Sequence, residues 1–158
     1  ATCAEPDFLA DLADSLQPKV HQMGCHEVSV AFQVFAPVSY AVPLLPAVAA
    51  RAKDLVPELS PKQLAHLLRG LREVDSKDPE LLSVLKARAG QLSHAFFGTH
   101  AVSVLVAFAD AEQVDAPLVQ RLGKFTLGCG LLAYGFQKAA RGNLGCAAML
   151  SFEQILVP

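Results

Sequence analysis

The sequence has few β-branched residues apart from valine, with three threonines and one isoleucine among its 158 residues. Leucine and alanine, which are good helix formers, are abundant instead. The hydrophobic content of 53% is enough to bury a substantial core. These features argue against a sheet and predict a folded, all-α protein.

Signatures of catalysis and of metal binding are also missing. No HxxxH or HExxH pattern links the five histidines, and there is no Walker loop or GxGxxG motif. The cysteines Cys3, Cys25, Cys129 and Cys146 are far apart without a CxxC pair, which is untypical of a zinc site or a dense disulfide framework. We expect reduced, mostly buried thiols, the alternative being one or two disulfides. We therefore expect no enzymatic activity, no catalytic residues, no metal site, no cofactor and no small-molecule substrate.

Charge is scarce and unevenly distributed. The formal net charge is −2, which is untypical of a protein whose main task is to grip a polyanion. Residues 1–50 carry five acidic residues against one basic residue, residues 51–88 carry eight basic against six acidic, and residues 89–158 are balanced. The centre of the chain is thus its basic part.

One uncharged stretch, Val28–Ala50, covers 23 positions and is long enough to cross a bilayer. Pro37, Pro43 and Pro46 interrupt it, because each interior proline removes a backbone hydrogen bond and clashes with the preceding turn. We therefore expect no transmembrane span. The sequence also lacks an initiating methionine and a visible signal or transit peptide, so we expect a processed mature form or a fragment.

Self-similarity is the most informative feature that is present. Four segments, beginning at Pro6, Pro43, Pro79 and Pro117, contain an apolar pair and another apolar residue three positions later. Corresponding apolar residues are 36 or 37 positions apart. The aligned sets are Phe8, Leu44, Leu81 and Leu118; Leu9, Leu45, Leu82 and Val119; and Leu12, Val48, Leu85 and Leu122.

A second helical segment precedes three of these segments. Its aligned residues are Phe32, Leu68 and Leu105, and then Phe35, Leu71 and Phe108, again 36 and 37 positions apart. A spacing of three residues puts each pair on one helical face. The best-defined helix start is Ser60-Pro61-Lys62-Gln63, where Ser60 is suited to the N-cap and Gln63 to a capping box.

Helix pairs of this kind must stack, because one pair cannot cover its own apolar faces. We predict a single helical-repeat domain over residues 1–158, an α-α superhelix (solenoid) of about 37-residue helix-turn-helix repeats. Its period is clear at 6–126, and residues 127–158 form degenerate terminal helices. The predicted helices cover 7–17, 26–37, 43–55, 60–74, 79–92, 97–113, 117–126, 129–141 and 144–156.

The segments Gln63-Leu-Ala-His-Leu-Leu-Arg-Gly-Leu-Arg-Glu-Val and Asp78-Pro-Glu-Leu-Leu-Ser-Val-Leu-Lys-Ala-Arg-Ala resemble the organellar helical-repeat families. These are the heptatricopeptide and octotricopeptide repeats and the repeats of FAST kinase-like proteins. The resemblance covers about residues 26–126, is partial at 6–16 and is weak after 126. It implies an organellar protein, mitochondrial before chloroplast, that acts in RNA metabolism or belongs to an organellar ribosome. No equivalent of the RAP domain that often ends such proteins is visible.

The best candidate for a binding surface is a basic stripe on the predicted helix 60–74. Lys62, His66 and Arg69 are spaced by four and three residues, with Arg72 nearby, and such residues contact the phosphates of RNA. The alternative is a solvated helix face on which Glu73 offsets part of the charge. No RNA-reading code recurs, because the equivalents of His66 and Arg69 in the other repeats are Val30 and Gln33, and Ser103 and Val106.

Other basic pairs lie toward the ends of predicted helices, where cations offset the helix macrodipole. These pairs either stabilise helix ends or bind a ligand, and the sequence leaves both interpretations open. They are Arg51 and Lys53, Lys86 and Arg88, Arg121 and Lys124, and Lys138 and Arg141.

Two functions agree with these observations. The first is a non-enzymatic organellar helical-repeat protein that acts in RNA metabolism or within a ribonucleoprotein, with single-stranded RNA as its partner. The alternative is a structural or scaffold subunit that docks through protein–protein contacts on a large organellar membrane or energy-converting complex. The family resemblance favours the first, whereas the high apolar content and low charge favour partner proteins of a larger assembly.

Overall fold

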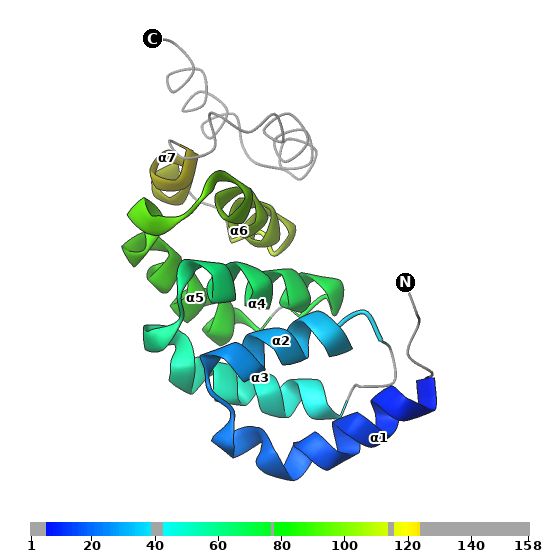
Figure 1. The fold of residues 1–158 in the computed structure, drawn as a ribbon. Coiled ribbons are helices and arrows are strands. Elements are labelled where there is room, and N and C mark those ends of the chain that lie inside the picture. Colours follow the sequence, from blue (N-terminus) through cyan, green and yellow to red (C-terminus); the bar gives the residue numbers. More distant parts are fainter. Residues whose placement is uncertain (1–5, 39–42, 77, 114–115, 124–158) are drawn as a thin grey trace.

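The computed structural model describes residues 6–38, 43–76, 78–113 and 116–123 (Figure 1). Within these ranges the chain is helical and contains no strand, which confirms the all-α prediction for this part of the protein. The α-helices are α1 (Pro6–Leu16), α2 (Cys25–Phe35), α3 (Leu44–Leu55), α4 (Pro61–Glu73), α5 (Pro79–Gln91), α6 (Gly98–Asp110) and α7 (Ala116–Gly123).

The helices are arranged in two rows that run along the stack (Figure 1). In the A row, α4 packs against α2 on one side and α6 on the other. In the B row, α1, α3, α5 and α7 pack against one another in chain order. Adjacent helices in the chain, such as α2 and α3 or α4 and α5, connect the two rows.

The predicted helix bounds agree with the structure to within three residues over residues 6–123. The predicted helices at 129–141 and 144–156 lie outside the described residues, as do Cys3, Cys129 and Cys146. The uncharged stretch Val28–Ala50 contributes to both α2 and α3. In the described ranges, none of the helices combines the length and the apolar character that crossing a bilayer requires.

The sequence pattern did not predict the 3₁₀ turns that follow three helices of the B row. These turns are η1 (Gln17–Gln22), η2 (Val56–Glu58) and η3 (Ser93–Ala95). After each turn one buried residue has an extended backbone, and these residues, 36 and 37 positions apart, are Met23, Leu59 and Phe96. Each apolar side chain is followed by the N-cap residue of an A-row helix.

Two arginines tie the B row to these turns. Arg51 of α3 donates a hydrogen bond from Nε to the carbonyl oxygen of Met23 at 3.0 Å. Arg88 of α5 donates from Nε and Nη2 to the carbonyl oxygen of Leu59 at 3.3 and 3.1 Å. We call these contacts the arginine clasps. They satisfy carbonyl groups that the chain leaves without a helical partner just before α2 and α4.

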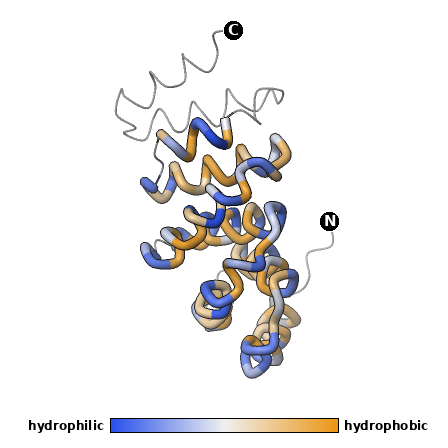
Figure 2. Tube along the Cα trace, turned by 90° about the vertical axis from the view of Figure 1, so that its left-hand side faces the viewer, coloured by the Kyte–Doolittle hydropathy of each residue, from blue (hydrophilic) through white to orange (hydrophobic). Residues whose placement is uncertain are grey.

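The core contains most of the aligned apolar positions, and Leu105 is partly buried against it. Phe32, Phe35, Leu68, Leu71 and Phe108 are all buried between the rows. Each helix shows hydrophobic and hydrophilic segments along the tube of Figure 2, as expected of helices that bury one face. The three aligned B-row sets are likewise buried in α3, α5 and α7.

Phe8 of α1, which is aligned with Leu44, Leu81 and Leu118, departs from this pattern because it is 60% exposed. Leu9 and Leu12 of the same helix are partly buried against the core. α1 packs on η1 and α3, and these contacts cover Leu9 and Leu12 but leave Phe8 at the surface. Phe8 thus differs in burial from the residues aligned with it, Leu44, Leu81 and Leu118.

Two A-row helices end in the same hydrogen-bonded motif. The amide of Ser76 donates to the carbonyl of Leu71 at 2.9 Å, and the amide of Gln113 donates to the carbonyl of Phe108 at 2.8 Å. This is the Schellman arrangement, in which the preceding residue has a left-handed backbone. Here these residues are Asp75, with φ of 48°, and Glu112, with φ of 56°. The motif ends α6 at Asp110, three residues before the predicted end of the helix.

A-row packing depends on a glycine in α4. A Cβ atom at Gly70 would lie 2.6 Å from Cβ and 3.1 Å from the carbonyl oxygen of Phe32 in α2. At Gly90 of α5, by contrast, it would meet only the guanidinium end of Arg121, at 3.1 Å. A methyl group at position 70 would therefore clash with α2, whereas one at position 90 would displace only the end of a flexible side chain.

We predict that Gly70→Ala lowers the free energy of unfolding by about 1–3 kcal/mol, because α2 must move away from α4. Gly90→Ala should raise it by up to about 1 kcal/mol through helix propensity, since the Arg121 side chain can shift. Urea denaturation of both variants measures the difference. A Gly70→Ala protein as stable as the wild type would contradict the close approach of α2 and α4.

The left-handed residue that ends α6 gives a second prediction. Glu112→Gly should raise the free energy of unfolding by about 1 kcal/mol, because glycine adopts positive φ without a Cβ clash. Ala87→Gly, at an exposed interior position of α5, is the matched control and should lower it by about 1 kcal/mol. Thermal denaturation compares them, and two glycines with the same destabilising effect would argue against the motif.

Candidate nucleic-acid interface

α4 begins as the sequence predicts. The amide of Gln63 donates to Oγ of Ser60 at 3.4 Å, and the amide of Ser60 donates to Oε1 of Gln63 at 3.0 Å, which forms a capping box. Pro61 occupies the first helical turn, where its missing N–H has no intrahelical partner. The leucines of α4 are buried toward α2 and α6, so the opposite face of the helix is directed to solvent.

Three of the four predicted site residues lie together on that outer face. Lys62 and Arg69 are exposed, and His66, between them, is partly buried. Their spacing of four and three residues places them along one side of α4. We call Lys62, His66 and Arg69 the α4 stripe.

Arg72, the fourth predicted residue, is oriented differently. Its Nε atom lies 3.7 Å from Oδ2 of Asp110 in α6, and its Nη2 atom lies 3.7 Å from Oε1 of Glu73. In the alternative interpretation of a solvated helix face Glu73 offsets part of the basic charge, and its ion pair is with Arg72. Both carboxylates reduce the attraction of Arg72 for an anion, so Arg72 is the weakest of the four candidates for a phosphate contact.

Two residues of the neighbouring helix extend the α4 stripe. The ring of His100 in α6 lies 6.2 Å from that of His66, centroid to centroid, at an interplanar angle of 79°. Phe97, the N-cap residue of α6, lies 6.4 Å from His100 at an angle of 69°. These separations are in the range of edge-to-face aromatic pairs. The Nδ1 atom of His100 is buried and makes no hydrogen bond.

Repeat alignment could not reveal this row of rings. The position aligned with His66 in α6 is Ser103, one turn beyond His100, because neighbouring A-row helices pack with an offset along their axes. The predicted helix 97–113 began at Phe97, whereas Phe97 is the N-cap of α6 and is 76% exposed. The available signal was an aromatic residue aligned with the cap positions Gly24 and Ser60.

Burial lowers the pKa of His66 below its usual value of 6.5. The positive charge of Lys62, the neighbouring His100 and the charge of Arg69 lower it further, in that order of effect. Each of these causes disfavours a proton on the imidazole. A bound anion would have the opposite effect, since it would stabilise the imidazolium between the two cations.

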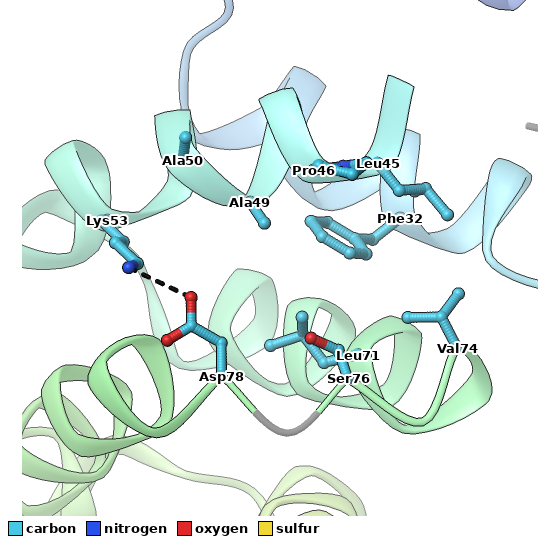
Figure 3. Close-up of a pocket in the computed structure, with 10 residues that line it drawn as sticks. All are labelled: Phe32, Leu45, Pro46, Ala49, Ala50, Lys53, Leu71, Val74, Ser76 and Asp78. Carbon is cyan, nitrogen blue, oxygen red and sulfur yellow. Dashed lines mark ion pairs between the residues drawn. The ribbon is translucent and has the colours of Figure 1, made fainter. Parts of the chain in front are cut away.

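A groove is lined by residues of α2, α3 and α4 and of the segment that leads into α5 (Figure 3). Its volume is about 470 Å³, which is within the size range of small-molecule sites. Most of its wall is apolar or formed by small residues. The lining residues are Phe32, Leu45, Pro46, Ala49, Ala50, Lys53, Leu71, Val74, Ser76 and Asp78.

The charged residues of this groove neutralise one another. Nζ of Lys53 lies 3.1 Å from Oδ2 of Asp78 and 2.6 Å from Oε2 of Glu80. Hydrogen bonds to Glu80 and Asp78 raise the pKa of Lys53. The backbone N–H of Leu81 and then Lys53 lower the pKa of Asp78, which is also the N-cap of α5. The groove thus offers apolar surface and no uncompensated charge, so it is a poorer candidate than the α4 stripe for binding an anion.

Of the other predicted basic residues, some make structural contacts and others lie exposed or outside the described residues. Arg51 and Arg88 form the arginine clasps, and Lys53 pairs with two carboxylates, which favours the structural interpretation for these three. Arg121 is exposed on α7. Lys124, Lys138 and Arg141 lie outside the described residues.

Cys25 is the cysteine that the structure describes, and its thiol is free. It is partly buried, with Sγ directed to the carbonyl oxygen of Leu55 at 3.8 Å. Burial and the charge of Glu58 raise the pKa of this thiol. A thiol with a raised pKa is a poor nucleophile, so Cys25 agrees with the expected reduced thiol.

Comparisons of the chain with protein-family models, with curated proteins and with solved structures gave no match. The assignment of a function therefore depends on the residues of this chain and on the geometry described above.

The lowered pKa of His66 predicts a pH dependence of stability. Neutral His66 contributes to the free energy of unfolding, and this contribution is fully present above pH 6.5, the pKa of the residue in the unfolded chain. It is lost as the pH falls from 6.5 through the lower pKa of the folded chain, because in this range the unfolded chain takes up the proton more readily than the folded chain. We expect the free energy of unfolding to fall between pH 7.5 and 5, and His66→Gln to reduce that fall. His94→Gln, at an exposed position of η3, is the control. Equal pH profiles for the wild type and His66→Gln would contradict the assignment.

Proposed function

We propose that this chain is a non-enzymatic, organellar helical-repeat protein that binds single-stranded RNA, acting in RNA metabolism or within a ribonucleoprotein such as an organellar ribosome. The observation that carries the proposal is the α4 stripe, in which two exposed cations flank a partly buried histidine. Lysine and arginine supply most of the affinity of proteins for nucleic-acid phosphates. The resemblance to organellar repeat families supports the organellar location, mitochondrial before chloroplast.

We also propose that the helix pairs are successive repeats of an α-α superhelix. Support comes from features that recur after 36 or 37 residues in different side chains and turns. Arg51 and Arg88 form equivalent clasps, and Asp75 and Glu112 end α4 and α6 in the same backbone conformation. In such an array each pair is covered by its neighbours, and one row of helices forms a continuous surface for a partner.

The absence of basic residues at the equivalent positions in α2 and α6 limits what the stripe can read. Val30 and Ser103 correspond to His66, and Gln33 and Val106 correspond to Arg69. A single basic helix contacts a short length of RNA and carries no base-by-base code. We therefore propose sequence-tolerant binding of a few phosphates at this point of the A row.

The test is the binding of single-stranded RNA by the purified chain across a series of salt concentrations. Affinity should fall with salt, and each phosphate contact should contribute about 0.7 to the slope of log K against log salt. Lys62→Ala with Arg69→Ala should reduce the slope by roughly 1.4. Lys19→Ala, an exposed lysine in η1, should leave it unchanged. A chain without salt-sensitive RNA affinity would refute the proposed function.

The alternative function is a structural or scaffold subunit of a large organellar membrane or energy-converting complex. A specific observation favours it: Val30 and Val34, one turn apart on α2, are 37% and 40% exposed. Apolar residues gathered in this way suit a protein–protein contact. In the salt experiment this function predicts no RNA affinity, together with self-association in gel filtration that Val30→Ser with Val34→Ser relieves.

A further inference from the structure

The start of α6 contains a residue that is unfavourable for stability in two respects. Phe97 is 76% exposed, more than any other large hydrophobic residue in the described ranges. It is also the N-cap residue, and its side chain makes no capping hydrogen bond. The corresponding residue of α4 is Ser60, whose hydroxyl caps the helix. A serine would serve the fold better at both counts, because it is polar and satisfies an N-terminal N–H group.

The surroundings of Phe97 are those of a nucleic-acid site rather than of a random surface position. Its ring is the end of a row that continues through His100 to His66. His66 lies between Lys62 and Arg69 on α4, which packs beside α6 (Figure 1). An exposed aromatic ring beside cations is the combination by which proteins hold single strands, since the ring stacks on a base and the cations contact phosphates.

We propose that Phe97 is a stacking platform for an unpaired RNA base, and that the phosphates flanking this base contact Lys62 and Arg69. This inference rests on the proposed function and makes it more specific, because only a single strand offers a free base face. His100 and His66 support the platform and connect it with the cations. The strand then crosses from α6 to α4, over the line where two A-row helices meet.

A stacking platform at Phe97 should give little base specificity. Aromatic stacking discriminates weakly among bases, because every base has a π face. The contribution of Phe97 to binding should therefore tolerate sequence changes, be somewhat larger for adenine than for uracil, and be lost when the strand is paired in a duplex.

The experiment is fluorescence anisotropy with a labelled twelve-nucleotide oligoadenylate RNA. Phe97→Ala should weaken binding by about fivefold to a hundredfold, which is the usual effect of losing one base–aromatic stack. Phe97→Trp should bind as well as the wild type or better, whereas Phe97→Leu, which is apolar but has no ring, should resemble alanine. Phe8→Ala removes the other highly exposed phenyl ring, on α1, and should have no effect.

Phe97→Ser separates binding from folding. It should weaken RNA binding as alanine does, yet melt at the same temperature as the wild type or higher, since serine can cap α6. The slope of log K against log salt should stay constant in the Phe97 variants, because they change no phosphate contact. The same oligonucleotide paired in a duplex should bind Phe97→Ala and the wild type equally.

The outcomes distinguish this proposal from the proposed function. Salt-sensitive RNA binding that Phe97→Ala leaves unchanged would overturn the stacking platform and leave the RNA function standing. Wild-type affinity in Phe97→Leu would also overturn it, because apolar bulk rather than a ring would then be sufficient. The absence of any RNA binding would refute both.

Discussion

The burial of α4 on two sides is the constraint on which the rest of the structure depends. Leu64, Leu67, Leu68 and Leu71 are at most 2% exposed, so nearly all of the apolar surface of this helix is covered. Because α2 and α6 provide that cover, α4 can direct only one narrow side to solvent. Lys62, His66 and Arg69 lie on that side, and their position follows from the packing of the leucines.

This arrangement explains how a chain with a net charge of −2 can offer a locally basic surface. Two carboxylates of the A row, those of Asp110 and Glu73, pair with Arg72 at one end of α4. On the B row, Lys53 holds Asp78 and Glu80. Within the described residues, charge is therefore segregated by ion pairing as well as by sequence, and short-range contacts matter more to the α4 stripe than the total charge does.

Much of the fold was readable from the sequence, because apolar spacing reports helices and their buried faces directly. The capping box at Ser60 and Gln63 and the starts of α4 and α5 were predictable, since caps and prolines act locally. The 3₁₀ turns, the exposure of Phe8 and the meeting of His66 with His100 were not. The exposure of Phe8 depends on how α1 packs on η1 and α3, and the meeting of His66 with His100 depends on how α4 packs on α6. Both involve residues far apart in the chain, which a local apolar pattern does not report.

The arginine clasps connect the last turns of B-row helices with the chain that precedes the A-row helices. The guanidinium of Arg88 reaches back from α5 to the carbonyl that precedes α4, so the beginning of one helix pair is fixed by its last turns. A fragment that ends after α4 would lose this partner for Leu59, whereas one that ends after α5 keeps it. A cut after α3 likewise keeps Arg51 together with the carbonyl of Met23. Each of these contacts therefore survives only in a fragment that contains the B-row helix carrying the arginine.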